Sequence, residues 1–260
     1  MGTKKFKVNK RSEFVKLFSK CHKYQPTFDD CVKDGLNEAR PYFQHGVPEF
    51  DIPPFDPFFA EEIIQMRGSQ SLNYKLTLRN VYESGWAKSH VYRFKSDLKN
   101  GYVQYNQWFP EKFLQGEWEI EYNLMGPYAN AGTFNLTLCE YNPSVYYNYL
   151  NHDIWLIRLA DNYTQVTTIN LKKGNFRDPY SPFNVRVNAI DSGDMELHVD
   201  NLITGLSPTL EFIVDRLLNI SWRPGFMVLK PLIDDIVSTA FTKIFNDAFR
   251  NFPFEKVFYK

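Results

Sequence analysis

The sequence lacks a charge imbalance and a long apolar run, and it has only three cysteines. Its 30 basic and 30 acidic residues cancel, so no global field would attract nucleic acid or an anionic membrane. No apolar stretch approaches the roughly 20 residues that a transmembrane helix needs, and residues 1–20 contain nothing like the apolar core of a secretory signal. These absences predict a soluble chain with no membrane span and no nucleic-acid partner.

Motifs of the common enzyme classes are missing as well. The five histidines are scattered without the spacing of a zinc site, and no glycine-rich phosphate loop is present. Residues 205–209 begin like a nucleophile elbow, but the final glycine is missing and Pro208 stands where the backbone must turn sharply. We therefore expect no catalytic site, no metal and no cofactor, and a hydrolase that uses Ser207 ranks last among the hypotheses.

Aromatic residues, in contrast, are abundant and make up 17% of the chain. One interpretation is a large aromatic core. The other is a core built around an apolar ligand, because ligand pockets are lined by the same side chains. Composition alone leaves both open.

The N-terminal part of the chain contains its most distinctive pattern. Cys21 and Cys31 bracket a proline, a threonine and the acidic pair Asp29-Asp30, which predicts a turn, an N-cap and a negatively charged first helical turn. If the two cysteines are bonded to each other, closure of this loop would stabilise the fold by roughly 2.5 to 3 kcal/mol, in an oxidising compartment. Cys139 lies on the more polar face of a predicted strand, and we expect it to be a free thiol.

The segment from Cys21 to Pro57 and a set of residues after Leu218 resemble the two ends of the takeout and juvenile hormone binding protein family of insects. That family opens with two cysteines, an acidic residue between them, a short helix, and a Gly-Ile-Pro-Glu-like segment followed by Asp-Pro. The matching residues here are Cys21, Asp29, Cys31, Gly46-Val47-Pro48-Glu49 and Asp56-Pro57. The C-terminal match runs in the order Leu218-Asn219, Trp222, Leu229, Pro231, Phe245, Asn246, Phe249, Pro253 and Phe258. The resemblance spans about residues 14–260.

The resemblance implies a fold, a function and a location. The fold would be a strongly curved antiparallel sheet wrapped as a super-roll around a long C-terminal helix, with an internal hydrophobic tunnel. The function would be transport of a small hydrophobic ligand such as a juvenile-hormone-like terpenoid, a fatty acid or another isoprenoid lipid. Because only Cys139 is left for a second disulfide, the chain resembles the takeout branch more than the hormone-specific one, and some relatives act in feeding or circadian signalling.

Members of this family are normally secreted into the haemolymph, and we expect the same of this chain. Since residues 1–20 contain no signal, either the chain starts after signal cleavage or it is a form that stays inside the cell. We also expect a flexible basic N-terminus over residues 1–13, one domain over 14–260, a monomer, and a glycan at Asn162, one of three sequons.

The residue periodicity is consistent with an α+β fold. Between residues 70 and 200, apolar and polar residues alternate, as in 72–79 and 117–124, which predicts one meandering antiparallel sheet with a wet face. Further predicted strands are 90–94, 133–141, 154–159, 165–171, 185–190 and 195–201. The acidic pairs Glu61-Glu62 and Asp234-Asp235 are interpreted as charges at helix starts.

After Pro231 the period changes to 3.6, which predicts an amphipathic helix about 30 Å long. A second helix is predicted over 208–220, with a break or kink at Pro224-Gly225 between the two. A curled sheet would enclose the long helix and leave a tunnel beside it. A flat α+β sandwich, which would cover only part of the helix, is the alternative.

The candidate ligand-binding residues lie on the apolar faces of the long helix and of the sheet. On the helix they are Val237, Ala240, Phe241, Ile244 and Phe245. On the sheet they are Tyr74, Leu76, Trp118, Tyr122, Phe134, Leu136 and Leu138. Tyr74, Trp118 and Tyr122 are the expected polar handles, because each carries one hydrogen-bond donor. Any of these residues is equally compatible with an ordinary packed core, and a filled core would favour an interaction or signalling module that acts through its surface.

Overall fold

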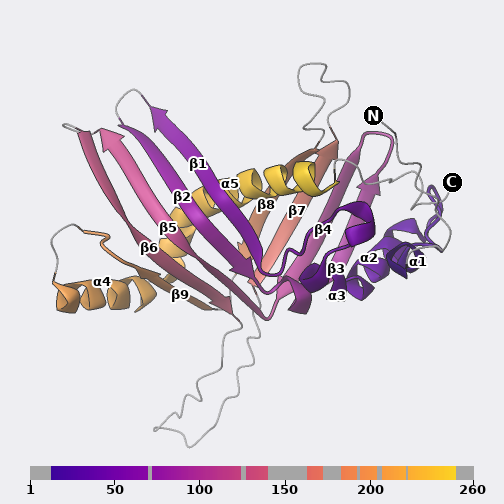
Figure 1. Cartoon of the computed structure of the whole chain (residues 1–260), viewed down its shortest axis with the longest axis horizontal. Helices are drawn as coiled ribbons and strands as arrows, with labels where there is room; N and C mark the ends of the chain where they lie inside the picture. The colour runs from indigo at the N-terminus through magenta and orange to yellow at the C-terminus, as the bar shows by residue number, and fades with distance from the viewer. Residues whose placement is uncertain are drawn as a thin grey trace, which may run out of the picture.

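The computed structural model describes residues 13–69, 72–123, 127–139, 163–171, 183–191, 194–203, 207–220 and 222–249. Three short helices open the chain, nine strands follow, and two helices close the described part (Figure 1). The predicted strand 154–159 and the sequon at Asn162 lie outside the described residues. None of the helices described is long and apolar enough to cross a membrane.

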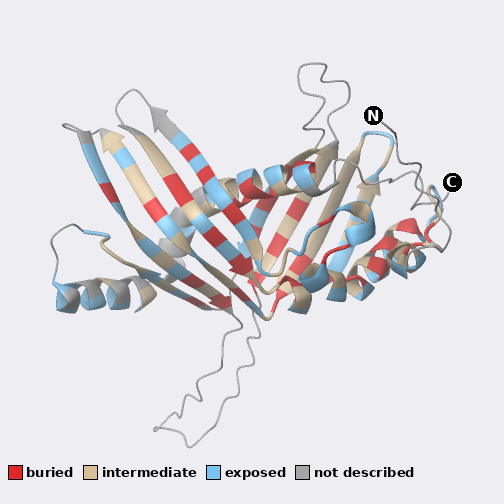
Figure 2. Ribbon diagram, viewed as in Figure 1, coloured by how far each residue is buried: buried red, intermediate tan, exposed pale blue. Residues whose placement is uncertain are grey.

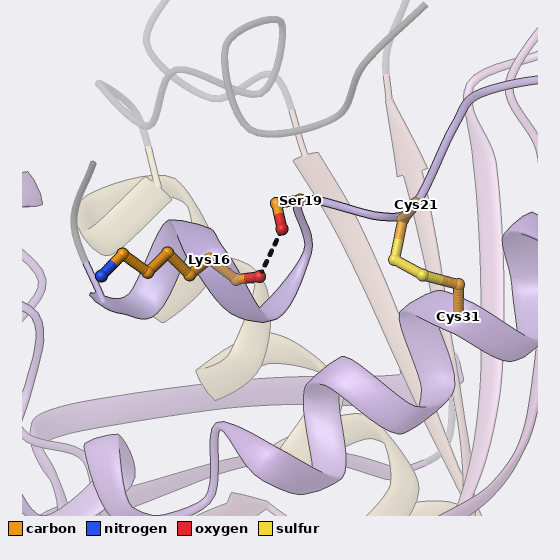
Figure 3. The surroundings of a disulfide bond; sticks show 4 residues. All are labelled: Lys16, Ser19, Cys21 and Cys31. Carbon is orange, nitrogen blue, oxygen red and sulfur yellow. Dashed lines mark hydrogen bonds between the residues drawn. A yellow bond between two sulfur atoms is a disulfide. The ribbon is translucent and has the colours of Figure 1, made fainter.

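The N-terminal part consists of α1 (Glu13–Leu17), α2 (Phe28–Glu38), α3 (Pro41–His45) and the 3₁₀ helix η1 (Pro48–Phe50). The disulfide between Cys21 and Cys31 joins the segment before α2 to its first turn (Figure 3). Thr27 is the N-cap residue, as predicted, but its side chain makes no capping hydrogen bond. A separate apolar group, called here the N-terminal cluster, surrounds the disulfide and contains Phe18, Cys21, Phe28, Val32, Ala39, Val47 and Ile52.

The strands form two antiparallel sheets. The five-stranded sheet has the order β1 (Phe58–Ser69), β2 (Leu72–Ser84), β5 (Glu111–Asn123), β6 (Pro127–Cys139) and β9 (Asp194–Val199). The four-stranded sheet has the order β3 (His90–Asp97), β4 (Tyr102–Phe109), β7 (Tyr163–Leu171) and β8 (Phe183–Asp191).

The prediction of one sheet is therefore wrong, because the chain leaves one hydrogen-bonded ladder and enters another. It does so after β2, where Gly85 has a φ of 111° and the 3₁₀ helix η2 (Trp86–Lys88) follows. A Cβ on Gly85 would lie 2.3 Å from the carbonyl oxygen of Glu111, so only glycine fits this close crossing. The return is at Pro110, which has no N–H to donate to a ladder. Apolar and polar residues alternate in the same way whether the strands form one sheet or two, so the sequence pattern could not distinguish them.

Strands β1 and β4 were not predicted, and the interpretation of Glu61-Glu62 as a helix start is wrong. Both glutamates lie in β1 and both are exposed. Ala60 and Ile63 on either side of them are buried, so the alternation of buried and exposed residues breaks at this point, although the register of β1 on β2 continues unchanged.

Helix α4 (Pro208–Ile220) is at its predicted position, and α5 (Trp222–Phe249) is longer than predicted. Pro231 lies inside α5 rather than at its start, and the predicted break at Pro224-Gly225 is wrong, because both residues lie within α5. Asp234-Asp235 is therefore also not a helix start.

The long helix α5 runs between the two sheets, with β1 on one side and β8 on the other (Figure 1). Buried residues concentrate where the strands meet α5 and where the two sheets join (Figure 2). The α+β class and the central C-terminal helix agree with prediction, whereas the expected tunnel stays a prediction.

Candidate functional site

One side of α5 is fixed to the edge of the four-stranded sheet by a ladder of polar side chains. Four side chains, each four residues after the last, accept hydrogen bonds from alternate backbone N–H groups of β8. The pairs are Asp234 with Ala189 at 2.8 Å, Ser238 with Val187 at 2.8 Å, Thr242 with Val185 at 3.0 Å and Asn246 with Phe183 at 2.9 Å. Four helical residues rise about 6 Å and two strand residues about 6.6 Å, so the two repeats match.

This ladder determines which face of α5 is left for other contacts. Ser238, Thr242 and Asn246 also donate to backbone carbonyls of β8. At these three positions, therefore, both the N–H and the C=O groups at the edge of the sheet are paired. The ladder faces β8 and Thr239, Lys243 and Asp247 are exposed, so the apolar side chains of α5 pack between these sides, against the sheet junction and the five-stranded sheet.

Two apolar clusters cover these faces. The junction cluster contains Trp86, Phe109, Leu136, Leu138, Tyr163, Val185, Val187, Ala189, Met195, Val237 and Phe241. The sheet cluster contains Ala60, Ile63, Leu78, Val81, Trp118 and Ala240, with Leu76, Phe134 and Ile236 packed against it. Ile244 packs against both clusters. Together they form one apolar layer around α5.

Ten of the twelve predicted ligand-binding residues lie in this layer. Val237, Phe241, Phe245, Leu136 and Leu138 belong to or pack on the junction cluster. Ala240, Trp118, Leu76 and Phe134 do the same for the sheet cluster, and Ile244 joins the two.

Tyr74 and Tyr122 are not part of the layer. They are paired with each other across β2 and β5, and the ring of Tyr122 lies 4.7 Å from that of Tyr128. Two of the three expected polar handles are thus on another part of the five-stranded sheet.

Of the three expected polar handles, Trp118 lies in the layer. Its side chain is only 8% exposed, and the indole Nε1 has no hydrogen-bond partner among the described residues. A Cβ on Gly132, which lies opposite on β6, would be 3.0 Å from Nε1, so glycine leaves room for this edge of the ring. Gln65, on β1, is also buried, and its Oε1 is unpaired while its Nε2 donates to Asp235 at 3.4 Å.

Sequence reasoning missed a buried ion pair at the sheet junction. Lys112 and Glu83, which are 1% and 4% exposed at the side chain, approach to 2.5 Å. Lys112 also donates to Gln165 at 3.0 Å, which links the five-stranded sheet to β7. Its Nζ lies within about 5 Å of the ring centres of Trp86, Phe109 and Tyr163.

The sequence pattern could have located Lys112 but not Glu83. Counting back in twos from Trp118 puts Lys112 on the same inward face of β5. Glu83 could not be found this way, because the irregular register between Arg79 and Tyr82 shifts the phase of β2.

Two tyrosines of the four-stranded sheet have shifted pKa values. Burial raises the pKa of the Tyr105 phenol to about 12, and a hydrogen bond to Thr167 acts in the opposite direction. Burial, and then the negative charges of Glu83 and Asp234, raise the pKa of Tyr163. Both phenols are therefore neutral donors over the physiological range.

The residues of the N-terminal motifs hold the fold together. Asp29 accepts hydrogen bonds from the Ser96 backbone and hydroxyl at 3.3 and 2.6 Å, so α2 is fixed to the edge strand β3. Asp56 accepts from the backbone N–H groups of Gly85 and Ala87 at 3.0 and 2.6 Å, which closes the turn between the sheets.

Asn219 has a similar role at the other end of the molecule. Its side-chain amide pairs with both the N–H and the C=O of Leu197, at 2.7 and 3.0 Å. The Leu-Asn motif therefore attaches α4 to the edge strand β9. The Nδ2 to which a glycan would be attached is engaged in this pair, and the glycan expected at Asn162 stays a prediction.

The described residues contain no group of three or more metal-ligating side chains. Ser207 is exposed and directly precedes α4, which fits the interpretation of this segment as a helix start.

Comparison with known proteins supports the resemblance. The family model for haemolymph juvenile hormone binding protein matches residues 4–259. The crystal structure of Takeout 1 from Epiphyas postvittana is similar with a TM-score of 0.51 at 15% identity, over 85% of this chain and 91% of that one. No curated protein sequence matches the chain. Since the family model covers nearly all 260 residues, the chain belongs to the haemolymph juvenile hormone binding protein family.

Proposed function

We propose that this protein is an extracellular carrier that binds a small, long hydrophobic ligand in the apolar layer around α5. The family to which it belongs is named for a hormone-binding protein, and the disulfide between Cys21 and Cys31 suits an oxidising compartment. The ligand class is a terpenoid, a fatty acid or another isoprenoid lipid.

The apolar layer is the observation that carries the proposal. It follows α5 from Ile233 to Phe245, which corresponds to about 18 Å of helix. An extended isoprenoid or acyl chain laid along this length would be stabilised by roughly 25 cal/mol for each Å² of apolar surface removed from water. The polar ladder keeps the same face of α5 turned to the layer.

Trp118 supplies the means to orient such a ligand. An indole N–H buried without a partner is costly, and a ligand oxygen that accepts from it would remove the cost. The ligand would therefore carry a hydroxyl, carbonyl or epoxide oxygen beside Trp118, with its hydrocarbon chain along Ala240 and Ile244.

Binding of farnesol, measured by displacement of a fluorescent apolar probe from the purified chain, tests this function. We expect saturable binding, and Trp118→Phe should weaken it about five- to tenfold, since a net hydrogen bond contributes about 1 to 1.5 kcal/mol. Farnesene has no oxygen, so its binding should be the same in both proteins.

The matched control is Trp108→Phe, because Trp108 lies on β4 and packs on His90, away from the layer. This variant should bind farnesol as the unchanged protein does. If no apolar probe binds and organic extraction of the purified protein recovers no lipid, the carrier proposal is wrong, and a surface-acting interaction module becomes the better explanation.

A further inference from the structure

Helix α4 turns its apolar side away from the protein. Half of the large apolar side chains that are exposed among the described residues fall between residues 202 and 227. They are Leu202, Ile203, Leu210, Phe212, Ile213, Leu217, Ile220 and Met227, which are between 41% and 73% exposed. Phe212 lies about 160° around α4 from Leu210, so it is left out, and we call the other seven residues the α4 patch.

Two polar contacts fix this orientation. Asn219 is held by both backbone groups of Leu197, so its side of α4 faces β9. At about 100° per residue, Leu210 lies on the opposite side of the helix and Leu217 close to it. Since these two are 47% and 59% exposed, a rotation that buried them would break the Asn219 pairing.

The turn before α4 is fixed as well. Asn130 donates to the carbonyl of Asn201 at 2.6 Å, and Asn201 donates back to Asn130 at 2.9 Å and to Ala131 at 2.8 Å. Leu202 and Ile203 follow this anchored turn and are exposed. The patch thus includes residues of this turn and of α4, which lies at the end of the molecule away from α1, α2 and α3 (Figure 1).

In place of the monomer expected from the sequence, we propose that the α4 patch is the interface of a homodimer, in which α4 packs against α4 of a second copy of this chain. Seven half-exposed side chains at roughly 100 Å² each offer on the order of 700 Å², which is close to the roughly 800 Å² that one partner contributes to a standard stable interface. A patch of this size also exceeds what monomers commonly leave in water. A convex apolar helix is self-complementary across a two-fold axis, where the same residues meet.

The chemistry of α4 fits a second copy better than a lipid surface. Helices that lie on membranes are rich in Lys and Arg on their polar face and often carry Trp. Residues 208–220 contain a single basic residue, the exposed Arg216, and no Lys or Trp. The net charge of the whole chain is zero, so no long-range attraction to an anionic bilayer would compensate.

Sedimentation velocity of the full chain over a wide concentration range tests the proposal. We expect a reversible monomer–dimer equilibrium. Leu217→Glu places two charges in the interface of each dimer and should raise its dissociation constant at least tenfold. Because Leu217 is 59% exposed in the monomer, the variant should keep the unfolding midpoint of the unchanged protein at concentrations where both are monomeric.

Ile190→Glu is the matched control, since Ile190 is 53% exposed on β8 and lies outside the patch. It should dimerise normally. The proposal is overturned if the unchanged chain stays monomeric at every concentration, or if Ile190→Glu dissociates the dimer as strongly as Leu217→Glu. A monomer that instead co-sediments with phosphatidylcholine vesicles, and loses this with Leu217→Glu, would show that a lipid surface covers the patch.

Discussion

The hydroxyl of Thr242 on α5 exchanges two hydrogen bonds with the backbone of Val185 on β8. It accepts from the N–H and donates to the C=O, both at 3.0 Å. A single side chain therefore replaces the strand that would otherwise pair with this residue of the sheet edge. Ser238 and Asn246 repeat this exchange and Asp234 accepts from the N–H of Ala189, so a helix becomes the neighbour of an edge strand.

Thr242→Val tests the energetic weight of this contact. The substitution keeps the size and the branched Cβ but leaves the N–H and C=O of Val185 without partners, so we expect unfolding to become easier by about 1 to 3 kcal/mol. Urea denaturation measures the change. Hydrogen exchange at the Val185 amide should accelerate as well.

Thr239→Val is the matched control on the same helix. Thr239 is exposed, and its hydroxyl donates only to the Asp235 carbonyl of its own helix, at 2.8 Å. A loss within about 0.5 kcal/mol is expected for this surface substitution. Equal losses in the two variants would mean that the ladder to β8 contributes no more than a local hydroxyl contact.

The ion pair of Lys112 and Glu83 provides a second test, because its two members are buried together. Lys112→Met leaves the Glu83 carboxylate uncompensated in an apolar and aromatic surrounding, and should destabilise the fold by about 3 to 5 kcal/mol. The double variant Lys112→Met with Glu83→Gln removes both charges and should recover most of this loss.

A double-mutant cycle with urea denaturation measures the coupling between the two residues. We expect it to be several times larger than that of the exposed pair Lys75 and Glu121, whose atoms approach to 2.8 Å on the outer face of the sheet. If the coupling energies were alike, burial would not be what strengthens the interior pair.

Sequence reasoning reached the parts of the fold that repeat regularly. The apolar stripe of α5 has a period of 3.6. Five predicted residues of this stripe and five predicted residues of the sheet meet in one layer. Whether the strands form one sheet or two could not be read from alternation, because Gly85 and Pro110 change the ladder without changing the period. Asn219 and Asn246 were found as members of the C-terminal motif. Their pairing with the edge strands β9 and β8 could not be predicted, because tertiary structure decides which edge strand lies beside each helix.

Removal of the disulfide should weaken the N-terminal part of the molecule first. Cys21 and Cys31 are ten residues apart, so their replacement by serine should cost about 2.5 to 3 kcal/mol in the chain-entropy model. Hydrogen exchange should increase in α2 and in the N-terminal cluster, while the amides of β8 next to α5 keep their protection. Uniform loss of protection over the whole chain would show that the N-terminal part does not unfold as a unit of its own.

The buried phenol of Tyr105 predicts a loss of stability at alkaline pH. Its pKa in the folded chain is about 12, whereas an unfolded tyrosine ionises near pH 10. Between these values the unfolded chain binds fewer protons than the folded one, so the free energy of unfolding falls by about 1.4 kcal/mol per pH unit from this group. Tyr105→Phe should remove this part of the slope above pH 10 and leave the profile below it unchanged. Tyr92→Phe, at a side chain that is 45% exposed, should keep the full slope, and a flattened slope in that variant would contradict the assignment to Tyr105.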